Sequence, residues 1–146
     1  MTLDNLVGVS LERIEPDKLT IRRLLEAADR NLADARIAQL SNENRFDAAY
    51  KAIMQLANAS LHACGFRTLT SRPGHHQTMI QSLPKSIGLD TDTMVILDAL
   101  RKQRNAADYS GDLVSNSAVS ECIGHAEKLR KATKTWLQSH RPDLAD

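Results

Sequence analysis

The sequence predicts an all-α protein, a four-helix up-and-down bundle with one short extra helix, and two observations support this fold class. Aromatic residues make up only 3% of the 146 residues, whereas Ala and Leu, which favour helices over strands, dominate the apolar set. Apolar residues also recur at helical spacing over four long segments, and the modest loops between them make successive helices antiparallel neighbours. We expect residues 1–146 to form a single domain, with its core over about residues 17–139.

The first two long helices follow from apolar stripes and from the residues at their ends. Residues 1–14 carry no clean period and are expected to be an irregular lead-in, and the first helix should span residues 17–40. The polar break at residues 41–44 offers several N-cap residues before a second helix over about residues 45–64. This helix is apolar on two sides, which predicts that it is the most buried one. Gly65 suits the position that ends it.

The second half of the chain predicts one short and two long helices. Residues 66–74 are rich in helix breakers and should form a loop, and a short helix is expected over residues 75–83. Thr91 suits the N-cap of the third long helix, which should span about residues 92–108. The last helix is expected over about residues 117–139.

Composition excludes several classes of protein. Nineteen Lys and Arg against eighteen Asp and Glu leave a net charge of +1, which argues against a strongly basic nucleic-acid sleeve or a polybasic membrane anchor. No apolar run is long enough to span a membrane, and the start of the chain lacks the pattern of a secretory signal. Cys64 and Cys122 lie far apart without a CxxC motif, which indicates reduced thiols and a cytoplasmic protein. No phosphate-binding loop or nucleophile motif is present, and we predict neither a metal nor a cofactor.

The most unusual segment is the end of the third long helix, residues 100–109. The helical period places Arg104 where the apolar stripe should continue, and Arg104–Asp108 and Asn105–Tyr109 are both i,i+4 pairs. A guanidinium, an amide, a carboxylate and a phenol beside a Gly-containing loop are groups that can hold a phosphate or position a scissile RNA bond. The same spacing also fits an ordinary helix-surface ion pair, worth about 0.2–0.5 kcal/mol, beside a tyrosine that only packs its ring.

These residues resemble a known family. Four antiparallel helices with Arg-Asn-x-x-Asp-Tyr at the end of the third, residues 104–109, resemble the HEPN superfamily, and Ala107-Asp108-Tyr109 matches one of its bacterial subgroups. The segments 46–50 and 74–76 also resemble that subgroup, and the resemblance covers roughly residues 17–139. It implies a homodimer with a composite site, and RNA binding or metal-independent RNA cleavage in a toxin–antitoxin or defence system. A nucleotidyltransferase-type antitoxin is the partner that it suggests.

The resemblance also implies roles for the site residues. Arg104 would bind or stabilise the scissile phosphate, Asn105 would orient Arg104 or the substrate, and Asp108 and Tyr109 would position or activate the reacting groups. The family usually has a His four to six positions after the Arg, and here Tyr109 stands in its place. Histidine is suited to acid–base catalysis near neutral pH, whereas tyrosine, with an ordinary pKa of about 10, is a poor base. A second hypothesis therefore stays open, a non-catalytic bundle that dimerises through these residues and binds a nucleotide or a protein.

Two further groups are candidate binding residues. His75 and His76 would supply the missing histidine if their loop lies near the end of the third helix; otherwise one caps the short helix and the other is solvated. Arg67, Arg72, Arg101 and Lys102 are candidates for a local basic patch that binds phosphate.

Overall fold

A computed structural model describes residues 2–71 and 73–145, and it confirms that the protein is mainly helical. In chain order the elements are η1 (Leu3–Leu6), β1 (Leu11–Arg13), α1 (Lys18–Ala35), α2 (Asn42–Ala63), β2 (Phe66–Thr68), α3 (His75–Gln81), α4 (Leu83–Ser86), α5 (Thr91–Ser110) and α6 (Asn116–His140). None of the helices in the described ranges combines the length and the apolar character that crossing a bilayer requires.

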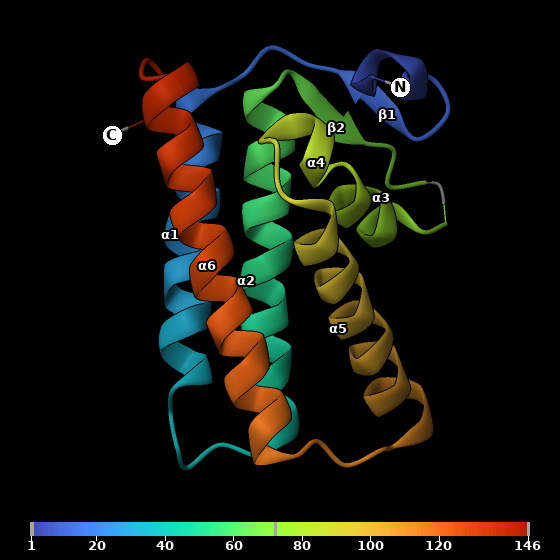
Figure 1. Cartoon of the computed structure of the whole chain (residues 1–146), viewed down its shortest axis with the longest axis vertical. Helices are drawn as coiled ribbons and strands as arrows, with labels where there is room; N and C mark the ends of the chain where they lie inside the picture. Colours follow the sequence, from blue (N-terminus) through green and yellow to red (C-terminus); the bar gives the residue numbers. More distant parts are fainter. Residues whose placement is uncertain (1, 72, 146) are drawn as a thin grey trace.

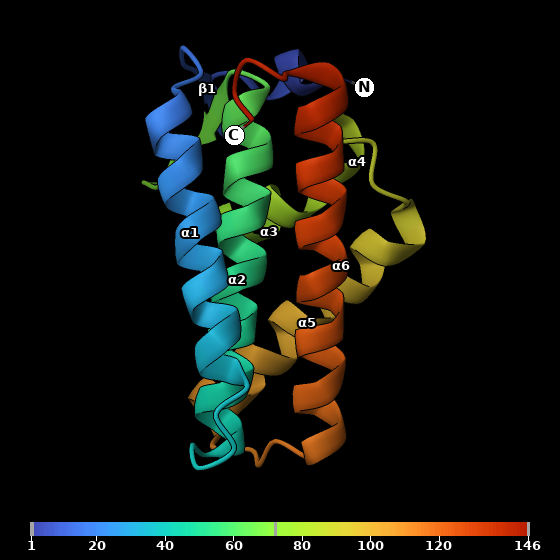
Figure 2. The same cartoon turned by 90° about the vertical axis from the view of Figure 1, so that its left-hand side faces the viewer.

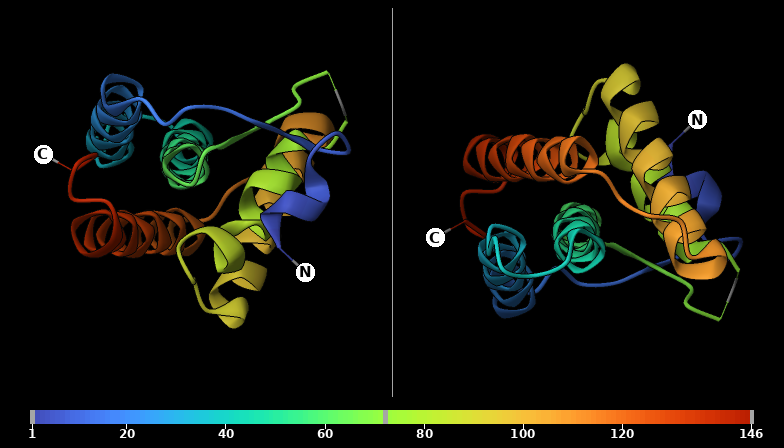
Figure 3. Two further views of the ribbon diagram at one scale, coloured as in Figure 1. Left: turned by 90° about the horizontal axis from the view of Figure 1, so that it is seen from above. Right: turned by 90° about the horizontal axis from the view of Figure 1, so that it is seen from below.

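Helices α1, α2 and α6 lie side by side, as Figures 1 and 2 show. The chain reverses direction from each long helix to the next, so that α1 and α5 run down Figure 1 while α2 and α6 run up. Helix α5 is inclined to the other three, which is clearest in the end-on views of Figure 3. The short helices α3 and α4 fill the space beside the upper end of α5 and pack against α2.

Helix α2 is the most buried element, as its two apolar stripes predict. Twelve of its residues are buried, whereas α5 buries only Leu97 and Leu100, and both helices lie wholly within the described residues. Small side chains let α1 and α6 approach α2 closely. Two buried hydroxyls on the α2–α6 contact are satisfied, because the Ser60 hydroxyl donates to the Leu56 carbonyl and lies 3.2 Å from the Thr133 hydroxyl.

The helix ends follow local capping chemistry, and two of them differ from the ends that the sequence predicts. The Ser41 hydroxyl caps α2 by accepting from the Asn44 N–H, and Gly65 follows the helix with a φ of 89°, a conformation that favours glycine. The N-cap of α5 is Asp90 and not Thr91, because the Asp90 carboxylate accepts from a backbone N–H of the first turn. Helix α1 ends at Ala35 and not near residue 40, since the chain already turns toward α2 there.

The N-terminal segment is not the irregular lead-in that we expected. It contains η1 and then β1, which pairs antiparallel with β2 so that Leu11 lies opposite Thr68 and Arg13 opposite Phe66. The expected loop over residues 66–74 therefore begins with a strand. The physical reason is a small apolar cluster in which Leu11 and Phe66 pack with Leu3 and Leu61 and fasten the segment to the end of α2.

Candidate functional site

The candidate site lies where α2, α3 and α5 meet. Asp47 and Tyr50 come from the first half of α2, His76 from the first turn of α3, and Arg104 from the second half of α5. Because Asp47 and Tyr50 are three positions apart, they project from the same side of α2. The fold thus gathers two residues from the second long helix around the arginine that the sequence singles out on the third.

Arg104 is held by two carboxylates. Its Nε atom lies 3.2 Å from Asp47 Oδ1 on α2 and 3.0 Å from Asp108 Oδ2 on its own helix, and its side chain is 26% exposed. Both contacts use Nε, and the two terminal NH2 groups form no hydrogen bond with the described residues. These groups carry four of the five N–H donors of the guanidinium, so Arg104 can be positioned by Asp47 and Asp108 and still donate to a phosphate.

Tyr50 joins Arg104 to His76. The guanidinium carbon of Arg104 lies 5.4 Å from the centre of the Tyr50 ring, a cation–π distance. The Tyr50 hydroxyl lies 3.3 Å from His76 Nδ1, and the His75 ring packs edge-on against His76 with 4.7 Å between centroids. His76 is therefore the histidine that the loop brings to the site, and His75 contacts the site through it.

The protonation states follow from burial and from the arginines. Burial raises the pKa of Tyr50 to about 12, although Arg104 and Arg101 act in the opposite direction, so the hydroxyl is protonated at neutral pH. Burial also lowers the pKa of His76, and the charges of His75, Arg104 and Arg101 lower it further. A neutral imidazole therefore sits beside a protonated phenol, and the Tyr50 hydroxyl can donate to His76 Nδ1 or accept from it.

The structure separates Tyr109 and Asn105 from this cluster. Tyr109 is 87% exposed, and five helical positions place it about 140° around the helix axis from Arg104. Asn105 is half-buried, and its side chain makes no hydrogen bond to the residues that the structure describes. Within one chain, Arg104 and Asp108 are the two members of the predicted motif that contact each other.

The structure places the described residues of the expected basic patch on two separate elements, α5 and β2. Arg101 pairs with Asp98 at 2.8 Å and is 15% exposed, so its charge is compensated on the flank of α5. Arg67 lies on the sheet, where it pairs with Glu12 of the opposite strand. Arg72 lies outside the described residues. Arg104 is nevertheless accompanied by other cations, because Lys51 pairs with Asp47 at 3.4 Å and the charge of Arg101 acts on Tyr50 and His76.

The sequence reasoning missed Asp47 and Tyr50 as site residues. Both lie in the segment 46–50 that resembles an HEPN subgroup, but the resemblance implies no role for either residue. The available signal was a carboxylate and a phenol three positions apart on the helix that the sequence predicts to be the most buried. Their partner is 57 positions away from Asp47, and helical spacing carries no information about contacts at that separation.

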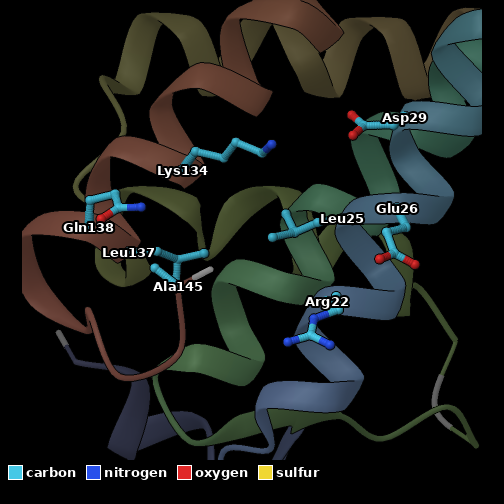
Figure 4. A pocket seen from close by; sticks show the side chains of 8 residues that line it. All are labelled: Arg22, Leu25, Glu26, Asp29, Lys134, Leu137, Gln138 and Ala145. Atoms are coloured by element: carbon cyan, nitrogen blue, oxygen red, sulfur yellow. The ribbon is translucent and has the colours of Figure 1, made fainter.

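A concavity away from the Arg104 site lies between α1 and α6 (Figure 4). Its volume is about 200 Å³, and Leu25, Leu137 and Ala145 give it an apolar floor. Two cations and two carboxylates surround that floor: Arg22, Glu26, Asp29 and Lys134. The balanced charges select no class of ligand. Across residues 2–71 and 73–145 no group of three or more His, Cys, Asp or Glu side chains is placed to hold a metal ion.

Comparison with known proteins identifies the family. The sequence profile of the HEPN domain matches residues 21–136, and the chain belongs to the HEPN domain family. The match spans α1 to α6, so every helix that contributes to the Arg104 site lies within it. No curated protein matches the sequence.

Proposed function

We propose that this chain is an RNA-binding HEPN protein of the toxin–antitoxin or defence type, in which Arg104 contacts an RNA phosphate. One observation carries the proposal: the Arg104 guanidinium is fixed by Asp47, Asp108 and the Tyr50 ring while its terminal NH2 groups are left for another acceptor. A planar guanidinium with free paired donors suits the bidentate binding of phosphate. Cytoplasmic location and a nucleotidyltransferase-type antitoxin as partner belong to the same proposal.

Metal-independent RNA cleavage is the activity that fits this site. In that reaction the 2′-oxygen loses its proton and attacks the adjacent phosphorus, and the bond to the 5′-oxygen breaks as that oxygen gains a proton. Arg104 would stabilise the charge that develops on the phosphate. His76, neutral at pH 7 and joined to Arg104 through Tyr50, would exchange the protons in place of the family histidine.

The test compares purified wild-type protein with Arg104→Ala in binding and cleavage of a mixed RNA pool in EDTA. Arg130→Ala is the matched control, because Arg130 is also a half-buried arginine that pairs with a carboxylate, Asp29, but lies on α6. The proposal expects Arg104→Ala to lose cleavage and to weaken RNA binding, and it expects Arg130→Ala to retain both. Equal RNA affinity of the two variants, with both folded by circular dichroism, would contradict it.

A homodimer is the proposed assembly. On the predicted apolar face that ends in Arg104, Leu97 and Leu100 pack into the core of the same chain, whereas Ile96 is exposed. The opposite side of α5 instead presents Val95, Ala99, Ala106 and Tyr109, which fall within about 80° of one another around the helix and are exposed or half-buried. We define these residues as the α5 stripe. We also propose that α1, α2, α5 and α6 form the expected up-and-down bundle, with the stripe at its surface.

Two observations favour a second candidate function, a non-catalytic HEPN bundle that binds a nucleotide or a protein. Tyr109, which replaces the family histidine, points to solvent, and two carboxylates already accompany Arg104. In this alternative, Arg104→Ala destabilises the protein or its dimer, and the wild type neither binds nor cuts RNA. The experiment above separates the two candidates because it measures folding, RNA binding and cleavage on the same preparations.

A further inference from the structure

A groove that the Arg104 site does not use runs along α6 on the side of α4. It has a volume of about 450 Å³ and shares no residue with the Arg104 site. Its walls include Lys128, Lys131, Trp136 and His140 of α6 and Ile87 at the end of α4. Figure 2 shows α4 beside the upper half of α6. We call these residues the α6 groove.

The groove contains a fixed pair of stacked rings. The Trp136 and His140 rings are nearly parallel, with an interplanar angle of 11° and 5.0 Å between centroids. His140 Nδ1 lies 3.3 Å from the Trp136 carbonyl, which orients the imidazole, while the indole packs partly into the core. The imidazole itself is exposed. A flat ring held in this way offers a nucleobase a face on which to stack, and stacking of this kind tolerates any base.

The charge of the groove is positive and uncompensated. Lys128 and Lys131 are exposed and make no ion pair with the described residues, and no Asp or Glu is among the described residues that line the groove. The neighbouring cation Arg130, in contrast, is paired with Asp29. From Lys128 to His140 the helix rises about 18 Å, so cations occupy one end of the groove and the stacked rings the other. Phosphates and bases of one extended strand would meet both.

We propose that the α6 groove binds single-stranded RNA, with a base stacked on the His140–Trp136 pair and phosphates on Lys128 and Lys131. The inference rests on the proposed RNA recognition only for the nature of the ligand. The groove is a second contact for the strand, separate from Arg104. A duplex keeps its bases stacked on one another and therefore cannot use the rings.

The sequence provides the probe, because Trp136 is its single tryptophan. A short oligouridylate should quench its fluorescence saturably, whereas inorganic polyphosphate, which has charge but no base, should not. Lys128→Glu/Lys131→Glu should weaken this binding roughly tenfold and reduce the slope of log affinity against log salt by about 1.4. The matched control is Arg23→Glu/Arg30→Glu, which reverses two exposed charges on α1 and should leave the affinity nearly unchanged.

Two additional variants make the outcome decisive. His140→Ala should weaken the RNA-dependent quenching of Trp136 several-fold, because it removes the exposed ring. Arg104→Ala should retain this quenching, whether or not the Arg104 site binds RNA. The inference is overturned if RNA does not quench Trp136, if polyphosphate quenches equally, or if Arg104→Ala abolishes the quenching while Lys128→Glu/Lys131→Glu retains it. If the groove binds a protein and not RNA, RNA would fail to quench Trp136.

Discussion

Arg104 is the residue on which the proposed function depends, and the two carboxylates around it both position and neutralise it. Asp47 lies on another helix and is 29% exposed, so it is the partner that an incoming phosphate would have to displace or share. The negative charge of Asp47, so close to the Arg104 guanidinium, repels a phosphate that binds there. The residue that holds the guanidinium therefore also limits its affinity for RNA.

Removal of the Asp47 charge should strengthen RNA binding. We expect Asp47→Asn to raise affinity roughly threefold to tenfold, equivalent to about 0.7–1.4 kcal/mol, because the amide can still accept from Arg104 Nε without repelling phosphate. Fluorescence anisotropy of a labelled RNA measures the change. Asp29→Asn, which alters the carboxylate partner of Arg130, is the matched control. A fall in affinity of Asp47→Asn would mean that positioning by the carboxylate outweighs its repulsion.

The two tyrosines of the chain provide an internal comparison. Tyr50 is 1% exposed and its hydroxyl contacts His76, whereas Tyr109 is exposed. We expect Tyr50→Phe to lower the free energy of unfolding by about 0.5–1.5 kcal/mol, the net value of a hydrogen bond. Urea denaturation should show no comparable loss for Tyr109→Phe. Equal stability of the two variants would show that the Tyr50 hydroxyl makes no net contribution.

At the scale of elements, α2 depends on its first turn. Ser41 accepts from the Asn44 N–H, so Ser41→Ala should cost about 1 kcal/mol of unfolding free energy. Ser120→Ala is the control, because Ser120 is exposed in α6 and its side chain makes no hydrogen bond to the described residues. Denaturant midpoints with unchanged slopes would report both values. A Ser41→Ala midpoint equal to that of the control would exclude a capping role.

The elements also show what sequence patterns can and cannot predict. The apolar stripes of α2 and α6 predicted both helices closely, since each stripe extends over several turns. The strands β1 and β2 were missed because each has three residues, too few for a period, and their pairing joins distant segments. At the site, Arg104 broke the apolar stripe and was predicted as a functional residue, and His76 was named among the candidates. Their connection through Tyr50 depends on tertiary packing, which no local spacing encodes.

At the scale of the whole molecule, two histidines couple stability to pH. His62 Nε2 accepts from the backbone N–H of Asp17 at 3.1 Å, which ties the end of α2 to the start of α1. Burial lowers the pKa of His62 below 6.5, with Asp17 opposing and Arg67 reinforcing the shift. The pKa of His76 is also lowered, by burial and by the charges of His75, Arg104 and Arg101. Each imidazole is therefore harder to protonate in the folded protein than in the unfolded chain.

The sign of the pH dependence follows. Between the ordinary histidine pKa of 6.5 and the lower folded values, the unfolded chain binds more protons than the folded protein. The contribution of these histidines to stability is therefore fully present above pH 6.5 and is lost on acidification. Urea midpoints measured from neutral pH to about pH 5 should fall, and His62→Gln should flatten the decline. His140→Gln should retain the wild-type pH profile. A profile of His62→Gln that matches the wild type would contradict the role of His62.

Assembly is the property of the whole molecule on which a composite site depends. The α5 stripe is the exposed side of a helix that buries Leu97 and Leu100 on its other side. We expect Ala99→Glu, which places a charge within the stripe, to convert a dimer into a monomer in sedimentation experiments. Leu19→Glu, on an exposed position of α1, should leave the dimer intact. If the monomer binds RNA but no longer cleaves it, both chains contribute to the reacting groups, with Tyr109 of the stripe as the residue to mutate next. A monomer that cleaves normally would show that Arg104, Tyr50 and His76 of one chain are sufficient.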